Sequence, residues 1–204
     1  DPCERLSLVN ARYYDSPTHS YHKSIHTHAH ARYNEIATDF ATHLDTTKYA
    51  GFWYEVYSHN VFLVDKCRCT RYNFTMVTET TFTDIFSCEK DGKPFTIPNH
   101  GSFDSSTPGK MVESLGPVSP PYWVLAIWNK DGVLLSDSKD ESDYAYALVY
   151  ACVGSPLLGE YTYFFSRLNE TIPDSVYSEM RSYATDHDIG LSSVKQVPMD
   201  GCSW

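Results

Sequence analysis

The chain has 204 residues, of which 42% are hydrophobic and 21% are charged, and its formal net charge is −10. This length and composition predict one compact domain with a core of its own, and they exclude a disordered or collagen-like chain. Nucleic-acid partners are not expected, because phosphates are bound by basic surfaces and the sequence has no lysine or arginine stripe. No apolar run approaches the ~20 residues of a membrane-spanning helix, so we expect a chain that does not span a membrane.

Residues 1–44 differ in texture from the rest of the chain. They are polar, have no sustained hydrophobic period and carry most of the histidines. His22, His26 and His30 would share one face of a helix, a spacing that suits a transition metal. No carboxylate or thiol is placed to complete such a site, so a polar insert is the better interpretation and no metal is expected. We treat this segment as an N-terminal extension that Cys3 ties to the rest of the chain.

The remaining domain, residues 45–204, alternates β-rich runs with turn residues such as Lys90-Asp91-Gly92. Eight runs in meander order are enough for an antiparallel sheet to close on itself. We therefore predict an all-β fold, an eight-stranded up-and-down barrel. The predicted strands are residues 52–59, 67–77, 81–88, 94–103, 110–115, 122–128, 144–152 and 160–167.

One helix is predicted after the last barrel strand. Pro173 suits a first helical position, and four residues behind it recur at helical spacing to form one apolar face for packing on the outside of the barrel. A last short strand is expected in the C-terminal tail. The insertion at 129–141 is expected to extend a hairpin at the closed end of the barrel. The apolar helix face is Val176, Tyr177, Met180 and Ala184.

The six cysteines predict disulfides rather than a zinc site, because they are even in number and are not grouped in CxxC pairs. In a hairpin centred between Thr78 and Glu79, Cys69 would lie directly opposite Cys88, close enough for a disulfide. The residues alone leave open how the other four, Cys3, Cys67, Cys152 and Cys202, pair.

Two N-x-S/T sequons, at Asn73 and Asn169, are expected glycosylation sites, because disulfides and glycans share the oxidising secretory compartment. The chain begins at Asp1, which we interpret as the start of a mature chain from which any targeting segment has been removed, and we expect a secreted protein.

Three segments resemble the signatures of the lipocalin family. Gly51-Phe52-Trp53 resembles its G-x-W motif, and Ser142-Asp143-Tyr144 resembles its T-D-Y motif. Arg167 matches the single arginine that follows the last barrel strand. With the cysteine positions, these motifs are most similar to the apolipoprotein D-like and the crustacyanin-like, pigment-binding lipocalins, over residues 44–204.

The resemblance implies structural roles at the base of the barrel. Trp53 would fill the closed end, Arg167 would lie across its face, and Gly51 would let the chain turn into the strand. A tryptophan in an ordinary sandwich core is the alternative, and Arg167 decides against it. With all cysteines paired, no thiol would be free to capture a ligand covalently. The resemblance also implies the disulfides Cys3–Cys152 and Cys67–Cys202.

A ligand site is expected inside the barrel, because side chains alternate between lumen and exterior. Placing the cysteines and Asn73 outside turns their neighbours inward, and the resemblance places Tyr122 in the lumen with Val124 and Ala126 behind it. The lumen would be aromatic and apolar with some phenol hydroxyls, although aromatic side chains could instead fill a narrow barrel. Ala145 and Ala147, expected to face the lumen, have small side chains and would leave space for a ligand. The expected ligand-binding residues are Tyr72, Phe74, Met76, Tyr122, Val124, Val149, Tyr161, Tyr163 and Phe165.

The function implied is a secreted carrier of a small hydrophobic molecule, bound non-covalently. A pigment, either a carotenoid or a biliverdin-type bilin, is the first choice, and the product would be a coloured protein. A steroid, retinoid or fatty acid carrier and a histidine-rich metal-binding or interaction protein are the alternatives. An enzyme is not expected, because no G-x-S-x-G, HExxH or Cys/His nucleophile arrangement appears. Apolar loops at 60–64 and 155–159 are expected at the mouth, where they could contact lipid or another subunit of a homo- or hetero-oligomer.

Overall fold

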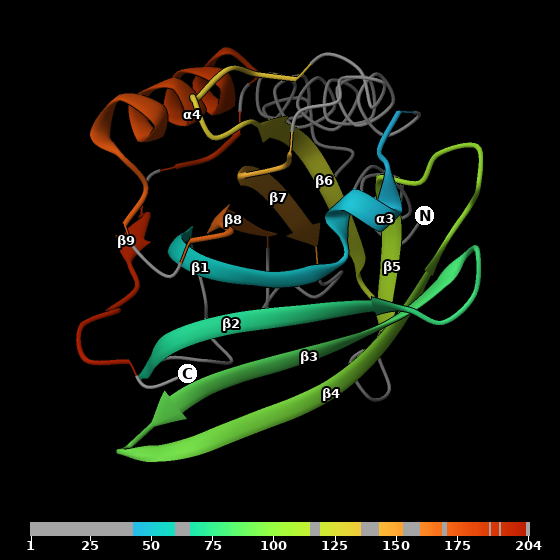
Figure 1. Cartoon of the computed structure of the whole chain (residues 1–204). Coiled ribbons are helices and arrows are strands. Elements are labelled where there is room, and N and C mark those ends of the chain that lie inside the picture. Colours follow the sequence, from blue (N-terminus) through green and yellow to red (C-terminus); the bar gives the residue numbers. More distant parts are fainter. Residues whose placement is uncertain are drawn as a thin grey trace, which may run out of the picture.

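The strands form one antiparallel sheet that closes on itself (Figure 1). The sheet order is β2-β3-β4-β5-β6-β7-β8-β1-β9, and an additional β2–β1 pairing closes the ring of eight strands. The predicted fold is therefore confirmed. The computed structural model describes residues 43–59, 66–114, 119–135, 143–152, 160–168, 171–187, 189–191 and 193–202. The strands are β1 (Gly51–His59), β2 (Cys67–Met76), β3 (Thr81–Lys90), β4 (Lys93–Phe103), β5 (Lys110–Ser114), β6 (Pro121–Trp128), β7 (Tyr146–Cys152), β8 (Glu160–Ser166) and β9 (Lys195–Gln196).

Every predicted strand is present, and each limit agrees within two residues. The last strand, β9, pairs with β1 on the outside of the ring, as expected for the tail. A short helix, α3 (Thr46–Tyr49), precedes β1 and is capped by the Asp45 side chain. Turn residues set most of these limits, as at Asp91-Gly92 between β3 and β4, whereas the β2–β3 turn, residues 77–80, has no glycine, proline or aspartate.

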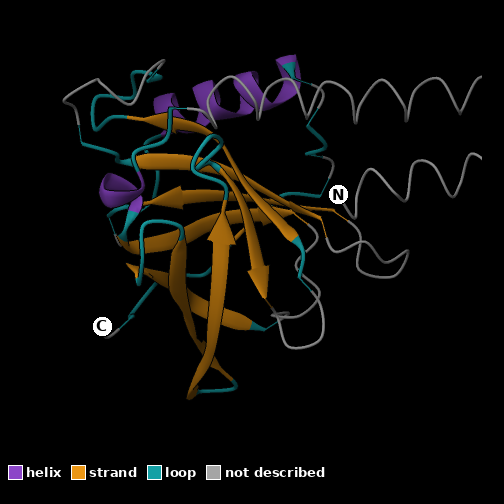
Figure 2. Cartoon of the chain, turned by 90° about the vertical axis from the view of Figure 1, so that its right-hand side faces the viewer, coloured by secondary structure: helices purple, strands orange, loops and turns teal. Residues whose placement is uncertain are grey.

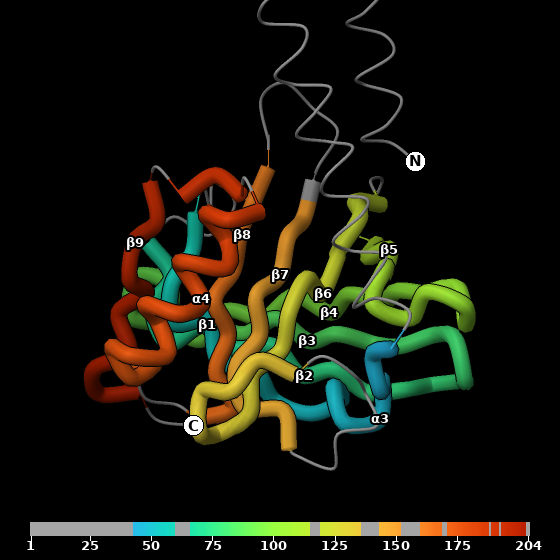
Figure 3. Tube along the Cα trace, turned by 90° about the horizontal axis from the view of Figure 1, so that it is seen from above, coloured from blue at the N-terminus to red at the C-terminus, as the bar shows by residue number. Residues whose placement is uncertain are grey.

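The second helix, α4 (Asp174–Asp186), lies across the outside of the barrel (Figures 2 and 3). Its buried residues are Val176, Met180 and Ala184, three of the four on the predicted apolar face. The fourth, Tyr177, stacks on Tyr57 with ring centroids 3.9 Å apart. The helix therefore packs on the outer faces of β1, β6, β7 and β8.

Trp53 and Arg167 close the base of the barrel. Trp53 is fully buried, and the Arg167 guanidinium lies 4.0 Å from the centroid of its ring. Arg167 Nη1 donates a hydrogen bond of 2.9 Å to the Phe52 carbonyl, and Nη2 donates to the Lys48 carbonyl. Gly51 has φ of 99°, and a β-carbon there would lie 3.2 Å from Arg167 Nη1. The contact implied by the resemblance is therefore present, and Gly51 is required by both the turn and the close approach.

The insertion at 129–141 adds to this closed end. Leu134 pairs with Trp128 in an isolated β-bridge, and Leu135 is buried in the same cluster as Trp53. The remainder of the insertion, 136–141, lies outside the described residues.

The predicted disulfide pairing at β2 is wrong. Cys67 bonds to Cys88, and Cys69 bonds to Cys202. The reason is a β-bulge: Arg68 lies opposite Glu89 but Arg71 lies opposite Ser87, so Cys69 and the residue after it share one partner position. The prediction assumed an unbroken ladder in which Cys69 faces Cys88. The implied pair Cys67–Cys202 is wrong for the same reason, and Cys3 of the implied Cys3–Cys152 pair lies outside the described residues.

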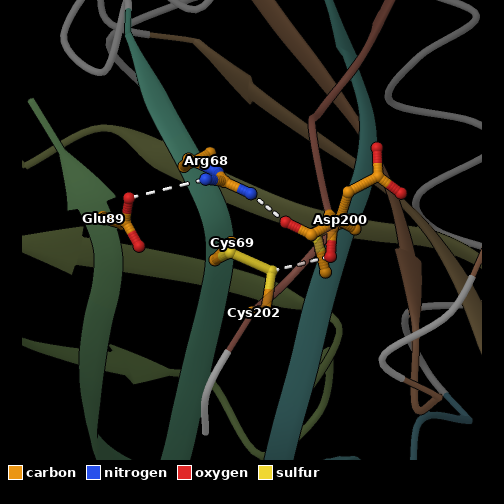
Figure 4. Close-up of polar contacts among 6 residues, drawn as sticks. Arg68, Cys69, Glu89, Asp200 and Cys202 are labelled. Carbon is orange, nitrogen blue, oxygen red and sulfur yellow. Dashed lines mark hydrogen bonds and ion pairs between the residues drawn. A yellow bond between two sulfur atoms is a disulfide. The ribbon is translucent and has the colours of Figure 1, made fainter. Parts of the chain in front are cut away.

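The bulge turns Cys69 away from the barrel and toward the C-terminal tail (Figure 4). Cys69 has φ of 55°, and its N–H donates a 2.8 Å hydrogen bond to the Pro198 carbonyl. Arg68 forms a 3.6 Å ion pair with Glu89 and donates to the Asp200 carbonyl. The tail is therefore held by one disulfide and by hydrogen bonds to both residues of the Arg68–Cys69 pair.

Peptide mapping can test the revised pairing, because trypsin cleaves at Arg68, between the two cysteines. Without reduction, we expect the dipeptide 67–68 to be linked to 72–90, and the tripeptide 69–71 to be linked to 196–204. Mass spectrometry of the linked peptides distinguishes the arrangements. If 67–68 were instead linked to 196–204, and 69–71 to 72–90, the pairs predicted at the sequence level, Cys67–Cys202 and Cys69–Cys88, would be correct.

Arg167→Lys tests the closed end. Lysine keeps the charge but loses the planar contact with Trp53 and one of the two hydrogen bonds, so we expect the free energy of unfolding to fall by about 1 to 2 kcal/mol. Urea denaturation followed by fluorescence measures the change. Arg181→Lys, on the exposed face of α4, is the matched control, with an expected change within about 0.5 kcal/mol. Equal effects of the two substitutions would show that Arg167 has no special role.

Candidate functional site

One cluster of side chains lines the interior of the barrel. Eight of the nine predicted ligand-binding residues belong to it, and Tyr163 also contacts a small neighbouring cluster that contains the ninth, Tyr161. Rings from β2 and β8, the two strands that flank β1, pack against one another on the inner wall: Tyr72 lies 5.1 Å from Phe165 and 6.3 Å from Tyr163, measured between centroids. The eight are Tyr72, Phe74, Met76, Tyr122, Val124, Val149, Tyr163 and Phe165.

Two alanines expected in the lumen lie elsewhere. Ala126 packs in the cluster beneath α4, because a register shift between Val124 and Ala126 exchanges the faces of β6 and turns Ile127 inward. Ala145 lies in the same outer cluster, just before β7 begins at Tyr146, where strand alternation does not apply. Cys67 and Cys88, expected outside, contribute to the interior cluster instead.

Trp53 seals the interior at the base of the barrel, and solvent reaches the inner wall farther from the base. Ile97 lies directly opposite Phe86 in the β3–β4 ladder, so both side chains occupy the inner face. Phe86 is buried, whereas Ile97 is 36% exposed, and Phe95 and Tyr163 on the inner wall are also only partly buried. Apolar side chains on an inner wall that solvent reaches are the lining expected of a ligand site. The apolar loops expected at the mouth lie outside the described residues.

Three carboxyl groups inside the barrel were missed by the sequence reasoning. Glu55, Asp84 and Glu113 are 1%, 0% and 6% exposed. Each is two residues from a buried apolar side chain of its strand, as Asp84 is from Phe82 and Phe86. The signal was therefore in the sequence: an acidic residue at the alternate position of an apolar run points into the lumen.

Asp84 and Glu113 form a pair without adequate hydrogen bonds. Both Asp84 carboxyl oxygens and Glu113 Oε1 are buried and have no partner of normal geometry, although Asn99 and the Asn73 N–H lie nearby. Burial raises the pKa of Asp84 to about 6. Burial and the repulsion of Asp84 hold the pKa of Glu113 well above its usual value. Both shifts favour the protonated carboxyl group, so full ionisation of the pair is held back.

Glu55 lies elsewhere on the inner wall. The Tyr72 hydroxyl donates to Glu55 Oε2 at 3.1 Å. Burial raises the pKa of Glu55 to about 7, and hydrogen bonds from Ser58 and Tyr72 offset the rise only in part. Tyr49 and Tyr122 share a buried hydroxyl contact of 2.9 Å. These groups give the aromatic wall a small number of polar positions.

The described residues contain no group of three or more His, Cys, Asp or Glu side chains arranged to hold a metal ion. His22, His26 and His30 lie outside those ranges, so the metal alternative stays a hypothesis. Over the same part of the chain, no helix is long and apolar enough to cross a membrane.

Comparison with solved structures shows that the fold is shared. Lobster apocrustacyanin A1 matches with a TM-score of 0.59 and 14% identity, over 81% of this chain and 84% of that chain. Insecticyanin from the tobacco hornworm Manduca sexta matches with a TM-score of 0.57 and 16% identity, over 77% and 82%. The siderocalin Ex-FABP, described as having dual ligand specificities, matches with a TM-score of 0.52 and 16% identity, over 74% and 94%. No family model and no curated protein sequence matches the chain.

Glu55→Gln tests the buried carboxyl. Because the folded pKa is about 7 and the unfolded value about 4.5, the folded protein alone holds this proton between those pH values, so stability falls as pH rises through that window. Glutamine cannot ionise. We therefore expect the stability of the variant relative to the unsubstituted protein to increase between pH 5 and pH 8 by up to about 3 kcal/mol.

Thermal or urea unfolding at the two pH values measures this difference. Glu79→Gln, in the exposed β2–β3 turn, is the control. A Glu55→Gln difference that does not change with pH would mean that this carboxyl is not protonated on folding.

Proposed function

We propose that this chain, which has the lipocalin fold, is a secreted carrier that holds a small, mostly apolar ligand inside the barrel without covalent attachment. The observation that carries this proposal is an interior sealed by Trp53 at one end whose inner wall stays solvent-accessible toward the other, at Ile97. A barrel used only as a scaffold would gain stability by filling that wall with its own side chains. The related folds of a crustacyanin, an insecticyanin and a dual-specificity siderocalin support the same interpretation.

The ligand contacts proposed are the nine lining residues named from the sequence. Aromatic rings make up much of this wall, and stacked neighbours such as Tyr163 and Phe165, 5.6 Å apart, present flat apolar surface. Covering such surface contributes roughly 25 cal/mol per Å² of apolar area before ordering costs are subtracted. An extended, flat, apolar molecule fits this wall best.

A pigment, a carotenoid or a bilin, is the proposed ligand class. Support comes from the sequence motifs, which resemble those of pigment-binding lipocalins, and from the aromatic wall, which suits a conjugated chain. A steroid, retinoid or fatty acid is the second candidate, because apolar walls accept many shapes.

Secretion and glycosylation belong to the same proposal. Two disulfides within the described residues fit an oxidising compartment. Asn73 alternates with the inward Tyr72 and Phe74 on β2 and is partly exposed, so a glycan there would lie outside the barrel. Asn169 lies outside the described residues. We propose no catalytic role for any residue of the interior.

The test is the colour of the protein purified from its source. We expect visible absorbance, loss of colour on extraction with organic solvent, and recovery at one pigment per chain when the extract is added back. A colourless protein that carries a fatty acid would support the second candidate. A protein that carries nothing and takes up nothing would contradict the carrier function.

A matched pair of variants locates the site. Val149→Phe adds bulk to the inner wall, where Val149 is fully buried, and we expect affinity for the extracted pigment to fall at least tenfold. Val112→Phe makes the same change at a 40% exposed position of β5 and should leave affinity unchanged. Equal binding by the two variants, both shown to be folded by thermal melting, would place the ligand outside the barrel.

A further inference from the structure

The charged groups buried in the barrel all have one sign. Among the described residues, the buried ionisable side chains other than tyrosine and cysteine are Glu55, Asp84 and Glu113, and none is basic. Glu55 has a hydrogen-bond donor in Tyr72. Asp84 and Glu113 differ, because three of their four carboxyl oxygens have no hydrogen bond of normal geometry, although Asn99, the Asn73 N–H and the carboxyl groups themselves lie close by.

Such a pair is unfavourable in a protein that binds nothing. A buried polar group without a well-formed hydrogen bond destabilises the fold by roughly 1 to 3 kcal/mol, and each carboxyl group opposes the ionisation of the other. Valine or leucine at these positions would continue the apolar pattern of β3 and β5 and remove both penalties. Groups retained in this state are suited to a partner that the chain itself does not supply.

The surroundings of the pair are aromatic. Asp84 is directly opposite Phe74 in the β2–β3 ladder and stands between Phe82 and Phe86 on β3. Phe74 lies 5.7 Å from both Phe82 and Tyr122, measured between ring centroids. Ring faces beside carboxylates favour a cation over an anion, because the faces of the rings are electronegative.

We propose that Asp84 and Glu113 form the polar anchor of the ligand site and that they bind a protonated amine on an otherwise apolar ligand. An ammonium group supplies up to three N–H donors to oxygens that lack a hydrogen bond of normal geometry, and its charge is opposite to that of the pair. The inference rests on the proposed carrier function and narrows it. A ligand that directs a carboxylate into the barrel, such as a fatty acid, would add a further negative charge there.

Three probes with the same twelve-carbon chain separate head-group recognition from apolar binding: dodecylamine, dodecanol and dodecanoate. Affinities are measured by titration calorimetry at pH 7.4, below the aggregation concentration of each probe. We expect the amine to bind at least tenfold more tightly than the carboxylate. In the double variant Asp84→Asn/Glu113→Gln, which keeps the shapes of both side chains, that ratio should fall to within about threefold of one.

The control double variant is Glu89→Gln/Asp131→Asn. It removes the same two charges from residues that ion-pair with Arg68 and Lys130 at the surface, so it corrects for the general attraction of an acidic protein for amines. We expect it to retain the preference for the amine. Because amides are neutral at the buried positions, we also expect the interior variant to unfold at a temperature no lower than that of the unsubstituted protein.

The outcomes distinguish the two proposals. If dodecanol binds but the carboxylate binds as tightly as the amine, or if the interior variant keeps the preference, the amine anchor is wrong and the carrier function stands. If none of the three probes binds, and the extracted protein takes up no pigment either, both proposals fail.

Discussion

The contact between Trp53 and Arg167 gives this barrel its two different ends. An indole ring at the base excludes water there, and the guanidinium above it ties the start of β1 to the end of β8 through two backbone carbonyls. Burial lowers the pKa of Arg167 to about 10, which still leaves it charged at neutral pH. With the base closed and α4 packed outside, the partly exposed Ile97 marks where solvent reaches the inner wall.

The interior has two kinds of surface, and they have opposite effects on the stability of the barrel. Rings such as Tyr72 and Phe165 stabilise the barrel by packing against one another, whereas the buried Asp84–Glu113 pair destabilises it because its oxygens lack hydrogen bonds of normal geometry. The disulfides of Cys67 and Cys69 tie β2 to β3 and to the C-terminal tail. Stability supplied by the frame allows the wall to keep groups that are unfavourable until a ligand covers them.

The fold could be predicted from the sequence because its signals are local. Turn residues set the strand limits, and Gly51, Trp53 and Arg167 identified the base. The disulfide pairing at β2 and the orientation of Ala126 could not be predicted, because each depends on a β-bulge. A bulge adds one residue to one strand and exchanges its two faces, while the residues on either side keep their β propensity. Alternation is therefore reliable only between bulges.

Strand alternation also explains why the aromatic residues of the inner wall were predicted from the sequence and the carboxyl pair was not. Tyr72 and Phe165 were recognised because they are aromatic at inward positions, whereas no acidic residue was predicted in the lumen. The direction of Asp84 is nevertheless fixed by its neighbours Phe82 and Phe86, whatever its charge. Strand geometry decides which way a side chain points. The chemistry of the side chain decides only which contacts would stabilise it in that position. An inward acid in an apolar run thus indicates a binding group more specifically than the aromatic residues around it.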